Sequence, residues 1–158
     1  MAAQTLIYDG HIIRPGEDWP LGWVLVESGH IVHMQAGKPP APRNAEMIDA
    51  RGCYVVPGFI DIHAHGAMGC SALDGKAESL RMMAQYYARH GTTAFLPTLE
   101  TASREQTMHA LEVIADTKRE PTGGAAILGA HLEGPYLNAA KCGAQDAHHI
   151  RRAGREEA

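Results

Sequence analysis

Short apolar segments alternate with turn residues over the first third of the chain. Two dipeptides, Asp9-Gly10 and Ser28-Gly29, each stand between two such segments and are typical of two-residue β-hairpin turns. Two further apolar segments follow a proline-rich loop at residues 37–42, which can form neither a helix nor a central strand. The pattern predicts that residues 1–55 form a small antiparallel β unit.

After residue 57 the pattern changes to strands that alternate with helices. Apolar residues at helical spacing predict a first helix, and Gly91 stands where a glycine would end it. Ser103 and Gln106 have the spacing of a capping box and predict the start of a second helix. The predicted elements are, in order, a helix at residues 76–90, a strand at 92–99, the helix that follows Ser103, and an apolar strand at 125–132.

A strand that precedes the first of these helices completes the series strand, helix, strand, helix, strand. Such an order implies parallel strands with right-handed crossovers, and therefore an α/β fold. Two architectures fit, the start of a (β/α)₈ barrel and part of an open doubly wound sheet. In both of them the functional residues lie at the carboxyl ends of the strands.

Residues 57–66 contain the first candidate functional residues. A Pro-Gly turn precedes the apolar residues 59–62, and His63 and His65 follow them. In a β-strand, residues i and i+2 project from the same face about 6.5–7 Å apart, so the two imidazoles could share one metal ion. The alternative is that the two histidines merely end the strand.

Glu133 follows the third predicted strand, at the position equivalent to the histidine pair. A carboxylate there can ligate one divalent ion or bridge two, whereas an acid beside an apolar strand carries a desolvation cost if no cation is near. A strand-end salt bridge is the alternative. His131 shares a face with Glu133, and we interpret it as a supporting or packed histidine rather than as a ligand.

A cluster of histidine and glutamate ligands suits hydrolysis. Divalent ions lower the pKa of bound water toward about 7 and polarise a carbonyl oxygen, which favours hydrolysis of an amide. The reaction also needs a general acid/base that protonates the leaving amine. Neither Asp61, inside the first predicted strand, nor Asp74, in a predicted loop, is a convincing candidate.

Composition and charge narrow the class of partner. The 158 residues are 45% hydrophobic and 20% charged, and the net charge of −4 comes without a basic stripe, so we expect a small-molecule partner and neither nucleic acid nor a membrane surface. No apolar run is long enough to span a bilayer and the N-terminus lacks a signal-peptide pattern, which favours a cytoplasmic protein. Three widely spaced cysteines predict reduced thiols rather than disulfides.

Three segments resemble members of the amidohydrolase superfamily. They are residues 57–66, 90–98 and 129–137, and the last two are similar to N-acetylglucosamine-6-phosphate deacetylases. The sequence His-Leu-Glu-Gly-Pro at residues 131–135 is the most specific part, because many relatives bridge their metals with a modified lysine instead. The resemblance implies that the chain is the N-terminal portion of such an enzyme.

The same resemblance implies a fold and its division. The chain would be the N-terminal part of a metal-dependent (β/α)₈ (TIM-like) barrel, preceded by strands of a small β-sandwich domain. Residues 1–55 would belong to the sandwich, and residues 56–158 would supply the first three β/α units of an incomplete barrel.

The resemblance also implies roles for individual residues. His63 and His65 would ligate one divalent ion, and Glu133 would ligate or bridge the other ion of a two-metal site that holds zinc or iron. Ala144 and Gln145 would contact substrate. Gln145 stands where the family often has a histidine, so an amide would make the hydrogen bond at this position.

The function implied is deacetylation of N-acetylglucosamine 6-phosphate to glucosamine 6-phosphate and acetate. The partner is then a small amino sugar phosphate, and the complete enzyme is expected to be a homo-oligomer, namely a dimer. The general acid/base aspartate is expected beyond residue 158, so we expect the 158 residues alone to be inactive. Two alternatives stay open: another amidohydrolase, dihydroorotase-like or a deaminase, and a catalytically silent metal-binding fragment.

Overall fold

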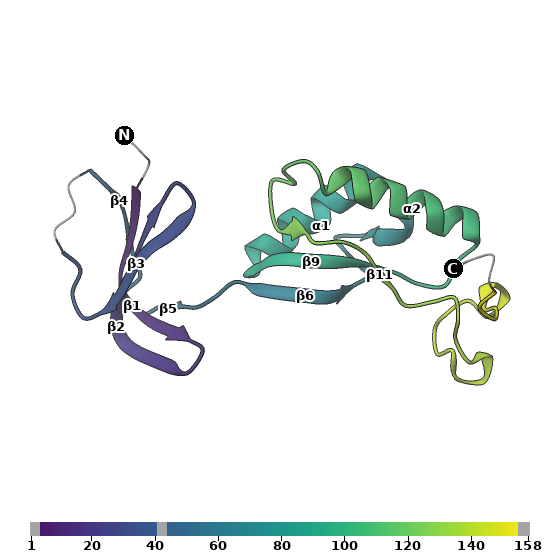
Figure 1. The fold of residues 1–158 in the computed structure, drawn as a ribbon, viewed down its shortest axis with the longest axis horizontal. Helices are drawn as coiled ribbons and strands as arrows, with labels where there is room; N and C mark the ends of the chain where they lie inside the picture. Colours follow the sequence, from purple (N-terminus) through teal and green to yellow (C-terminus); the bar gives the residue numbers. More distant parts are fainter. Residues whose placement is uncertain (1–3, 41–43, 155–158) are drawn as a thin grey trace. The chain divides into compact units, whose positions relative to one another are not determined.

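The computed structural model describes residues 4–40 and 44–154 of the chain (Figure 1). The chain divides between Pro57 and Gly58 into two compact units. Within the described ranges, the first unit contains five strands, and the second combines strands with the helices α1 and α2. None of the described helices is long and apolar enough to cross a membrane.

The first unit is one sheet with the strand order β3-β2-β1-β4, and β5 also pairs with β1. Its strands are β1 (Gln4–Arg14), β2 (Glu17–Glu27), β3 (His30–Ala36), β4 (Glu46–Asp49) and β5 (Tyr54–Val55). The hairpin predicted at Ser28-Gly29 is confirmed, because both residues have positive φ, 50° and 80°, and Glu27 pairs with His30. The apolar side chains buried in this unit include Leu6, Ile12, Trp23, Val24 and Ala50.

The hairpin predicted at Asp9-Gly10 is wrong, because β1 continues through both residues. Asp9 has a φ of 57°, and the register of the β1–β2 pairing shifts on both sides of Gly10, so this dipeptide forms a β-bulge. The chain reverses instead between Arg14 and Glu17. A Cβ atom at position 10 would lie 2.6 Å from Val55 Cγ2, so the glycine permits the close approach of the neighbouring strand.

The first sheet is mixed and not antiparallel as predicted. The pairs β1–β2 and β2–β3 are antiparallel, but β4 and β5 both run parallel to β1. The turn between β4 and β5 does not reverse the chain, because Ala50 N–H donates to Tyr8 O (2.8 Å) and His11 N–H donates to Cys53 O (3.0 Å). Both segments therefore stay on β1. The loop predicted at residues 37–42 lies partly outside the described residues.

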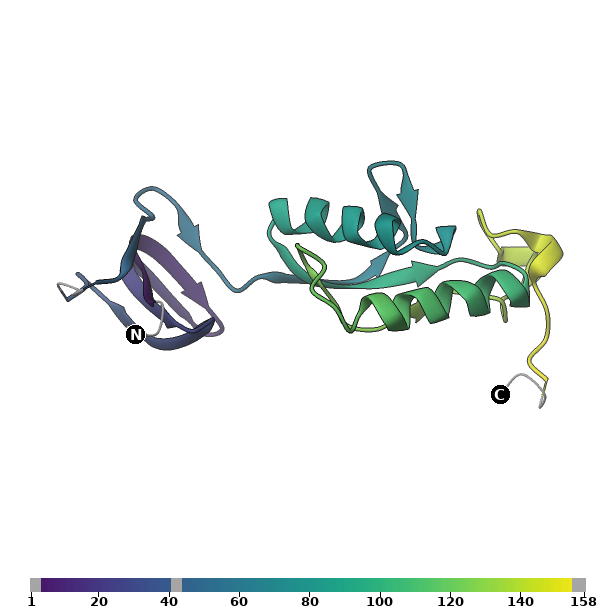
Figure 2. The ribbon, with the colours of Figure 1, turned by 90° about the horizontal axis from the view of Figure 1, so that it is seen from above.

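The second unit is an α/β structure with a parallel sheet. β9 lies at its centre, with β6 along one edge and β10 and β11 along the other. The two α-helices lie side by side over one face of this sheet (Figures 1 and 2). The strands and α-helices are β6 (Phe59–Ala64), β7 (Gly66–Ala67), β8 (Cys70–Ser71), α1 (Ala77–Arg89), β9 (Thr92–Leu99), α2 (Arg104–Thr117), β10 (Ala126–Ile127) and β11 (His131–Leu132). The short 3₁₀ helices are η1 (Ala72–Asp74), η2 (Ala139–Lys141) and η3 (Ala147–His149).

Both predicted helices are present. α1 lies between Lys76 and His90, and Gly91 follows with a φ of 85°, as expected for a glycine just beyond a helix end. Ser103 Oγ accepts a hydrogen bond from Gln106 N–H (3.1 Å), which is the first half of the predicted capping box. The core lies between the helices and the sheet and contains Leu80, Met83, Ala84, Phe95, Leu99, Ala110, Ile114 and Ile127.

The third predicted strand, residues 125–132, is two short strands rather than one. β10 and β11 both pair with β9, but the register shifts by one residue between them. Pro97 of β9 lies opposite this break and has no N–H to donate, which interrupts the hydrogen-bond ladder. The shift determines which residues of the third segment face the same side of the sheet as the histidine pair.

Candidate metal centre

His63 and His65 lie together at the carboxyl end of β6. Their Nε2 atoms are 3.1 Å apart, so both rings turn toward the same point, as the two-residue spacing predicts. Hydrogen bonds fix the backbone at both histidines. His63 N–H donates to Asp61 Oδ1 (3.0 Å), and His65 O accepts from Ala72 N–H (2.8 Å) at the start of η1.

Glu133 approaches the histidine pair from the other side of β9, because it follows β11. It directly follows β11, and its N–H donates to Leu99 O (3.0 Å) at the end of β9. Its Oε2 atom lies 2.9 Å from His65 Nε2 and 3.5 Å from His63 Nε2. The three side chains predicted as metal ligands therefore converge at the carboxyl ends of parallel strands.

The arrangement of these three side chains fits a divalent ion. Ligand atoms about 2.1 Å from a shared ion stand about 3.0–3.4 Å apart in octahedral or tetrahedral geometry, and the three separations of 2.9, 3.1 and 3.5 Å lie close to this range. In addition, Glu133 Oε2 is buried and accepts no hydrogen bond of regular geometry from the described residues. A bound cation would satisfy this oxygen.

His65 departs in one respect from the usual surroundings of a ligating histidine. Its Nδ1 atom is buried and has no hydrogen-bond partner among the described residues. A histidine that binds metal through one ring nitrogen generally donates the other N–H to a carboxylate, a carbonyl or water. This second partner is not supplied by the described part of the chain.

His131 lies beside the cluster and outside the group of mutually close ligand atoms. Its ring packs edge-on against the ring of His63, with centroids 4.7 Å apart and planes at 89°. Its Nδ1 atom is 3.4 Å from the hydroxyl oxygen of Thr98 in β9. Sequence reasoning did not identify Thr98 as part of the site, because a threonine in an apolar strand is an ordinary strand residue.

Neither of the two aspartates considered as a general acid/base belongs to the group of mutually close ligand atoms. Asp61 accepts from the backbone N–H of His63. Asp74 Oδ2 accepts from Ser71 N–H (3.0 Å) and from the hydroxyl of Ser79 (2.8 Å), and these hydrogen bonds hold the pKa of Asp74 below its usual value. Both carboxylates therefore stabilise local backbone structure.

The residues predicted to contact substrate lie in the loop between η2 and η3. Gln145 Oε1 accepts from the backbone N–H of Thr101 (2.6 Å), just beyond the carboxyl end of β9. This bond fixes the orientation of the amide and leaves its NH₂ group to donate elsewhere. Ala144 lines a polar cavity with Glu100, Asp146 and other residues of this end of the unit.

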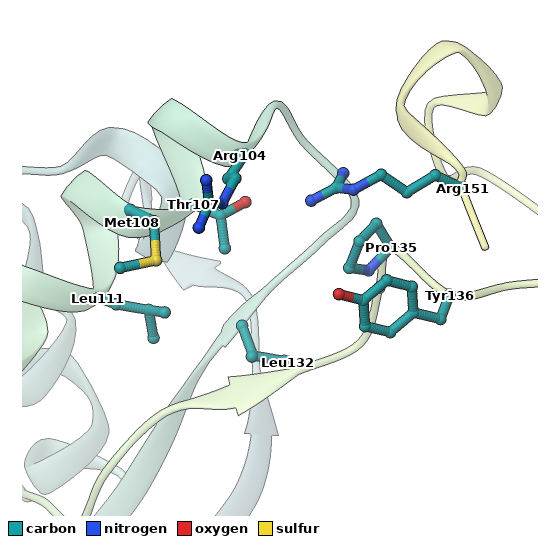
Figure 3. A pocket seen from close by; sticks show the side chains of 9 residues that line it. Arg104, Thr107, Met108, Leu111, Leu132, Pro135, Tyr136 and Arg151 are labelled. Carbon is teal, nitrogen blue, oxygen red and sulfur yellow. The ribbon is translucent and has the colours of Figure 1, made fainter. Parts of the chain in front are cut away.

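A second cavity of about 180 Å³ lies beside α2 and is separate from the cluster (Figure 3). Leu132 lines it, and this side chain alternates along the chain with His131 and Glu133, so it points to the opposite face of the sheet. The cavity is lined by Arg104, Thr107, Met108, Leu111, Leu132, Gly134, Pro135, Tyr136 and Arg151.

The chain matches the model of the amidohydrolase family over residues 54–158. It is 39% identical over 115 residues to an N-acetylglucosamine-6-phosphate deacetylase from Vibrio furnissii, a match that covers 73% of this chain and 29% of the relative. It is 32% identical over 154 residues to the protein of the same name from Bacillus subtilis, covering 96% of this chain and 39% of the relative.

Solved structures give the same similarity. The crystal structure of N-acetylglucosamine-6-phosphate deacetylase from Pasteurella multocida matches 98% of this chain with a TM-score of 0.87 and 27% sequence identity. The match covers 40% of that structure. The chain therefore spans about two fifths or less of the length of these relatives.

Proposed function

The chain belongs to the amidohydrolase family, and we propose that it forms part of a metal-dependent deacetylase that converts N-acetylglucosamine 6-phosphate to glucosamine 6-phosphate and acetate. The convergence of His63, His65 and Glu133 at the carboxyl ends of parallel strands supports this proposal most strongly. The segment that contributes Glu133 lies within the matched region, and the relatives that match it are named for this reaction.

We propose that the second unit is the beginning of a (β/α)₈ barrel and that the first is part of a small β-sandwich. The exposure of the outer strand supports the barrel. Phe59, Ile60 and Ile62 of β6 are 62%, 60% and 66% exposed, and a barrel strand of this composition is covered by neighbouring strands and helices. In this arrangement residues 1–55 belong to the sandwich and residues 56–158 to the barrel.

In the proposed enzyme His63 and His65 would hold a divalent ion, and Glu133 would hold the same ion or a second one. The ion, zinc or iron, supplies acidified water and polarises the acetamide carbonyl when it is bound. The protein would position the ion and the substrate carbonyl, because His63, His65 and Glu133 come from two segments that flank the central strand β9. Three side chains are too few for two ions, so a two-metal site requires further ligands from the complete enzyme.

We propose that the loop at Ala144 and Gln145 contacts the sugar phosphate. Gln145 is held by Thr101 N–H through its oxygen, so its NH₂ group is available to donate to an oxygen of the substrate. The general acid/base that protonates the leaving amine is proposed to be an aspartate outside the 158 residues. A cytoplasmic location and a dimeric state also belong to this proposal.

Turnover of the proposed substrate tests the function. The intact protein loaded with Zn²⁺ should release a free amine from N-acetylglucosamine 6-phosphate faster than from N-acetylglucosamine, and a chelator should abolish the reaction. Glu133→Gln should lower bound metal and turnover by at least about tenfold, whereas Glu112→Gln, an exposed change on α2, should alter neither. Turnover of a dihydroorotase or deaminase substrate without deacetylation would contradict the proposal, as would wild-type activity in Glu133→Gln.

A further inference from the structure

The hydroxyl of Thr98 connects the two segments that carry the candidate metal ligands. Thr98 is 1% exposed and lies in β9, between β6 and β11. We propose that Thr98 is a positioning residue that holds the histidine pair in the geometry required for metal binding. This inference rests on the proposed function, and it assigns a role to a residue that is not itself a ligand.

The first contact of Thr98 is with the backbone between the two histidines. Its Oγ1 atom accepts a hydrogen bond from Ala64 N–H at 2.8 Å. Ala64 is 4% exposed and is flanked on both sides by the candidate ligands, so its N–H has no access to water. Loss of this acceptor would leave a buried N–H unpaired and would release the peptide that joins His63 to His65.

The second contact of Thr98 is with His131, whose ring packs against the ring of His63. Thr98 Oγ1 lies 3.4 Å from His131 Nδ1, and the ring of His131 packs edge-on against His63. The hydroxyl proton also has an acceptor in Leu96 O at 3.2 Å. If the proton is directed there, both lone pairs of the hydroxyl are free to accept, one from Ala64 and one from Nδ1–H of His131. One hydroxyl would then restrain both the backbone and the ring of the histidine site.

The hydroxyl of Thr98 lies where the strand pairing around β9 is irregular. On one edge of β9 the register of β6 shifts between Asp61 and Ala64, and on the other edge the register shifts between β10 and β11. Both neighbours of β9 therefore contain one extra residue opposite this part of the strand. The hydroxyl of the next residue, Thr98, supplies the acceptor for Ala64 where the ladder is irregular.

Metal affinity measured on intact variants tests this role. Thr98→Val has nearly the shape of threonine but lacks the hydroxyl, and Thr98→Ser keeps the hydroxyl. Thr122→Val is the matched control, because the hydroxyl of buried Thr122 also accepts from a backbone N–H, that of Gly124 (3.2 Å), and donates to a carbonyl, that of Ala125 (2.8 Å). Thr122 lies before β10, away from the carboxyl ends of the strands.

The Zn²⁺ affinity is read by competition with a chromophoric chelator, and the visible spectrum of bound Co²⁺ reports the ligand geometry. We expect Thr98→Val to weaken Zn²⁺ binding by about 10- to 100-fold and to change the Co²⁺ spectrum. Thr98→Ser and Thr122→Val should stay within about threefold of the wild type.

Several outcomes would contradict the inference. Wild-type Zn²⁺ affinity in a folded Thr98→Val protein would overturn it, and so would an equal loss in Thr122→Val. If Thr98→Val does not fold, a folded Thr98→Ser protein that has lost Zn²⁺ binding would overturn it as well. Failure of the wild-type protein to bind Zn²⁺ or Co²⁺ is a different result, which would overturn the proposed function on which the inference rests.

Discussion

At the scale of single residues, the proposed chemistry depends on polar atoms that lack hydrogen-bond partners among the described residues. Glu133 Oε2 is buried beside two imidazole nitrogens and accepts no regular hydrogen bond from the described residues. A buried carboxylate oxygen in this condition is costly unless a cation binds it. The side-chain amide of Gln145 uses one of its two polar groups within the unit. Its oxygen accepts a hydrogen bond from Thr101 N–H, and its NH₂ group remains available to donate.

Gln145→Glu tests the proposed substrate contact. The carboxylate can still accept from Thr101 N–H, but it replaces the NH₂ donor with a negative oxygen that repels a sugar phosphate. We expect the KM for N-acetylglucosamine 6-phosphate to rise by about tenfold or more, which corresponds to about 1.4 kcal/mol. Gln35→Glu, an exposed change on β3, should leave KM unchanged. Equal KM values for the two variants would exclude Gln145 from substrate binding.

The three candidate metal ligands could be predicted from the sequence, but Thr98, the residue that we propose positions them, could not. His63, His65 and Glu133 could be proposed together because each follows an apolar strand and the carboxyl ends of parallel strands meet at one edge. Thr98 could not be proposed, because threonine is an ordinary strand residue. Its role depends on the register shifts opposite Pro97, which arise only when three strands pair.

At the scale of elements, the hairpin β7–β8 constrains the chain directly after His65. Gly66 pairs with Ser71, and Gly66 O accepts from the hydroxyl of Tyr87 on α1 (2.9 Å). Burial raises the pKa of Tyr87, with a further contribution from the carboxylate of Asp61. The hairpin is therefore hydrogen-bonded to α1, which contributes side chains to the core.

Gly66→Ala should disturb this hairpin. A Cβ atom at this position would collide with the carbonyl oxygen of Cys70, which is backbone and has little room to move. We expect a loss of stability of roughly 1–3 kcal/mol and weaker metal binding. Gly129→Ala is the matched control, since the nearest heavy atom to its Cβ would be Leu96 Cδ2 at 3.6 Å. Urea unfolding measures both variants, and equal midpoints would show that the hairpin accommodates a side chain.

The cap of η1 predicts a pH dependence. The pKa of Asp74 is lowered by hydrogen bonds from Ser71 N–H and from the hydroxyl of Ser79. A lowered pKa in the folded state means that the stabilisation is complete above the ordinary aspartate pKa of about 3.9 and is lost as pH falls through the folded pKa. Because Asp74 is exposed, solvent screens its charge, so Asp74→Asn should cost only a few tenths of a kcal/mol at pH 7, about 0.5 at most, and the difference from the wild type should shrink in acid.

Thermal unfolding at a series of pH values measures this dependence. Asp116→Asn is a suitable control, because Asp116 is exposed on α2 and contacts Arg119 at the surface. A constant difference between Asp74→Asn and the wild type from pH 7 down to acid would show that the charge of Asp74 does not support the cap.

Local sequence signals identified some elements correctly and misled at others. Ser28-Gly29 forms the expected turn, and Glu27 pairs with His30 across it. Asp9-Gly10 has the same local preference for positive φ, but β4 and β5 occupy the other edge of β1 and hold the strand extended. An Asp-Gly or Ser-Gly sequence indicates only that the backbone can adopt positive φ at these two residues. Whether the chain then forms a turn or a β-bulge depends on the strands that pair with it.

At the scale of the whole molecule, the chain corresponds to about two fifths or less of the length of its relatives. The order of strands and helices after residue 57 predicted a parallel sheet, because parallel strands need helical crossovers. The mixed first sheet was not predictable in this way, since the described part of the connection from β1 to the parallel strand β4 contains the strands β2 and β3 and no helix. The apolar residues exposed along β6 support the proposal that further strands and helices of the complete enzyme cover this strand.

We propose that His63, His65 and Glu133 hold the divalent ion on which deacetylation depends. Anomalous X-ray diffraction at the zinc edge, on crystals of the intact active protein, tests it most directly. We predict an anomalous peak about 2.0–2.2 Å from Nε2 of each histidine and from Glu133 Oε2. An active, zinc-containing protein whose anomalous peak lies away from these three side chains would contradict the claim.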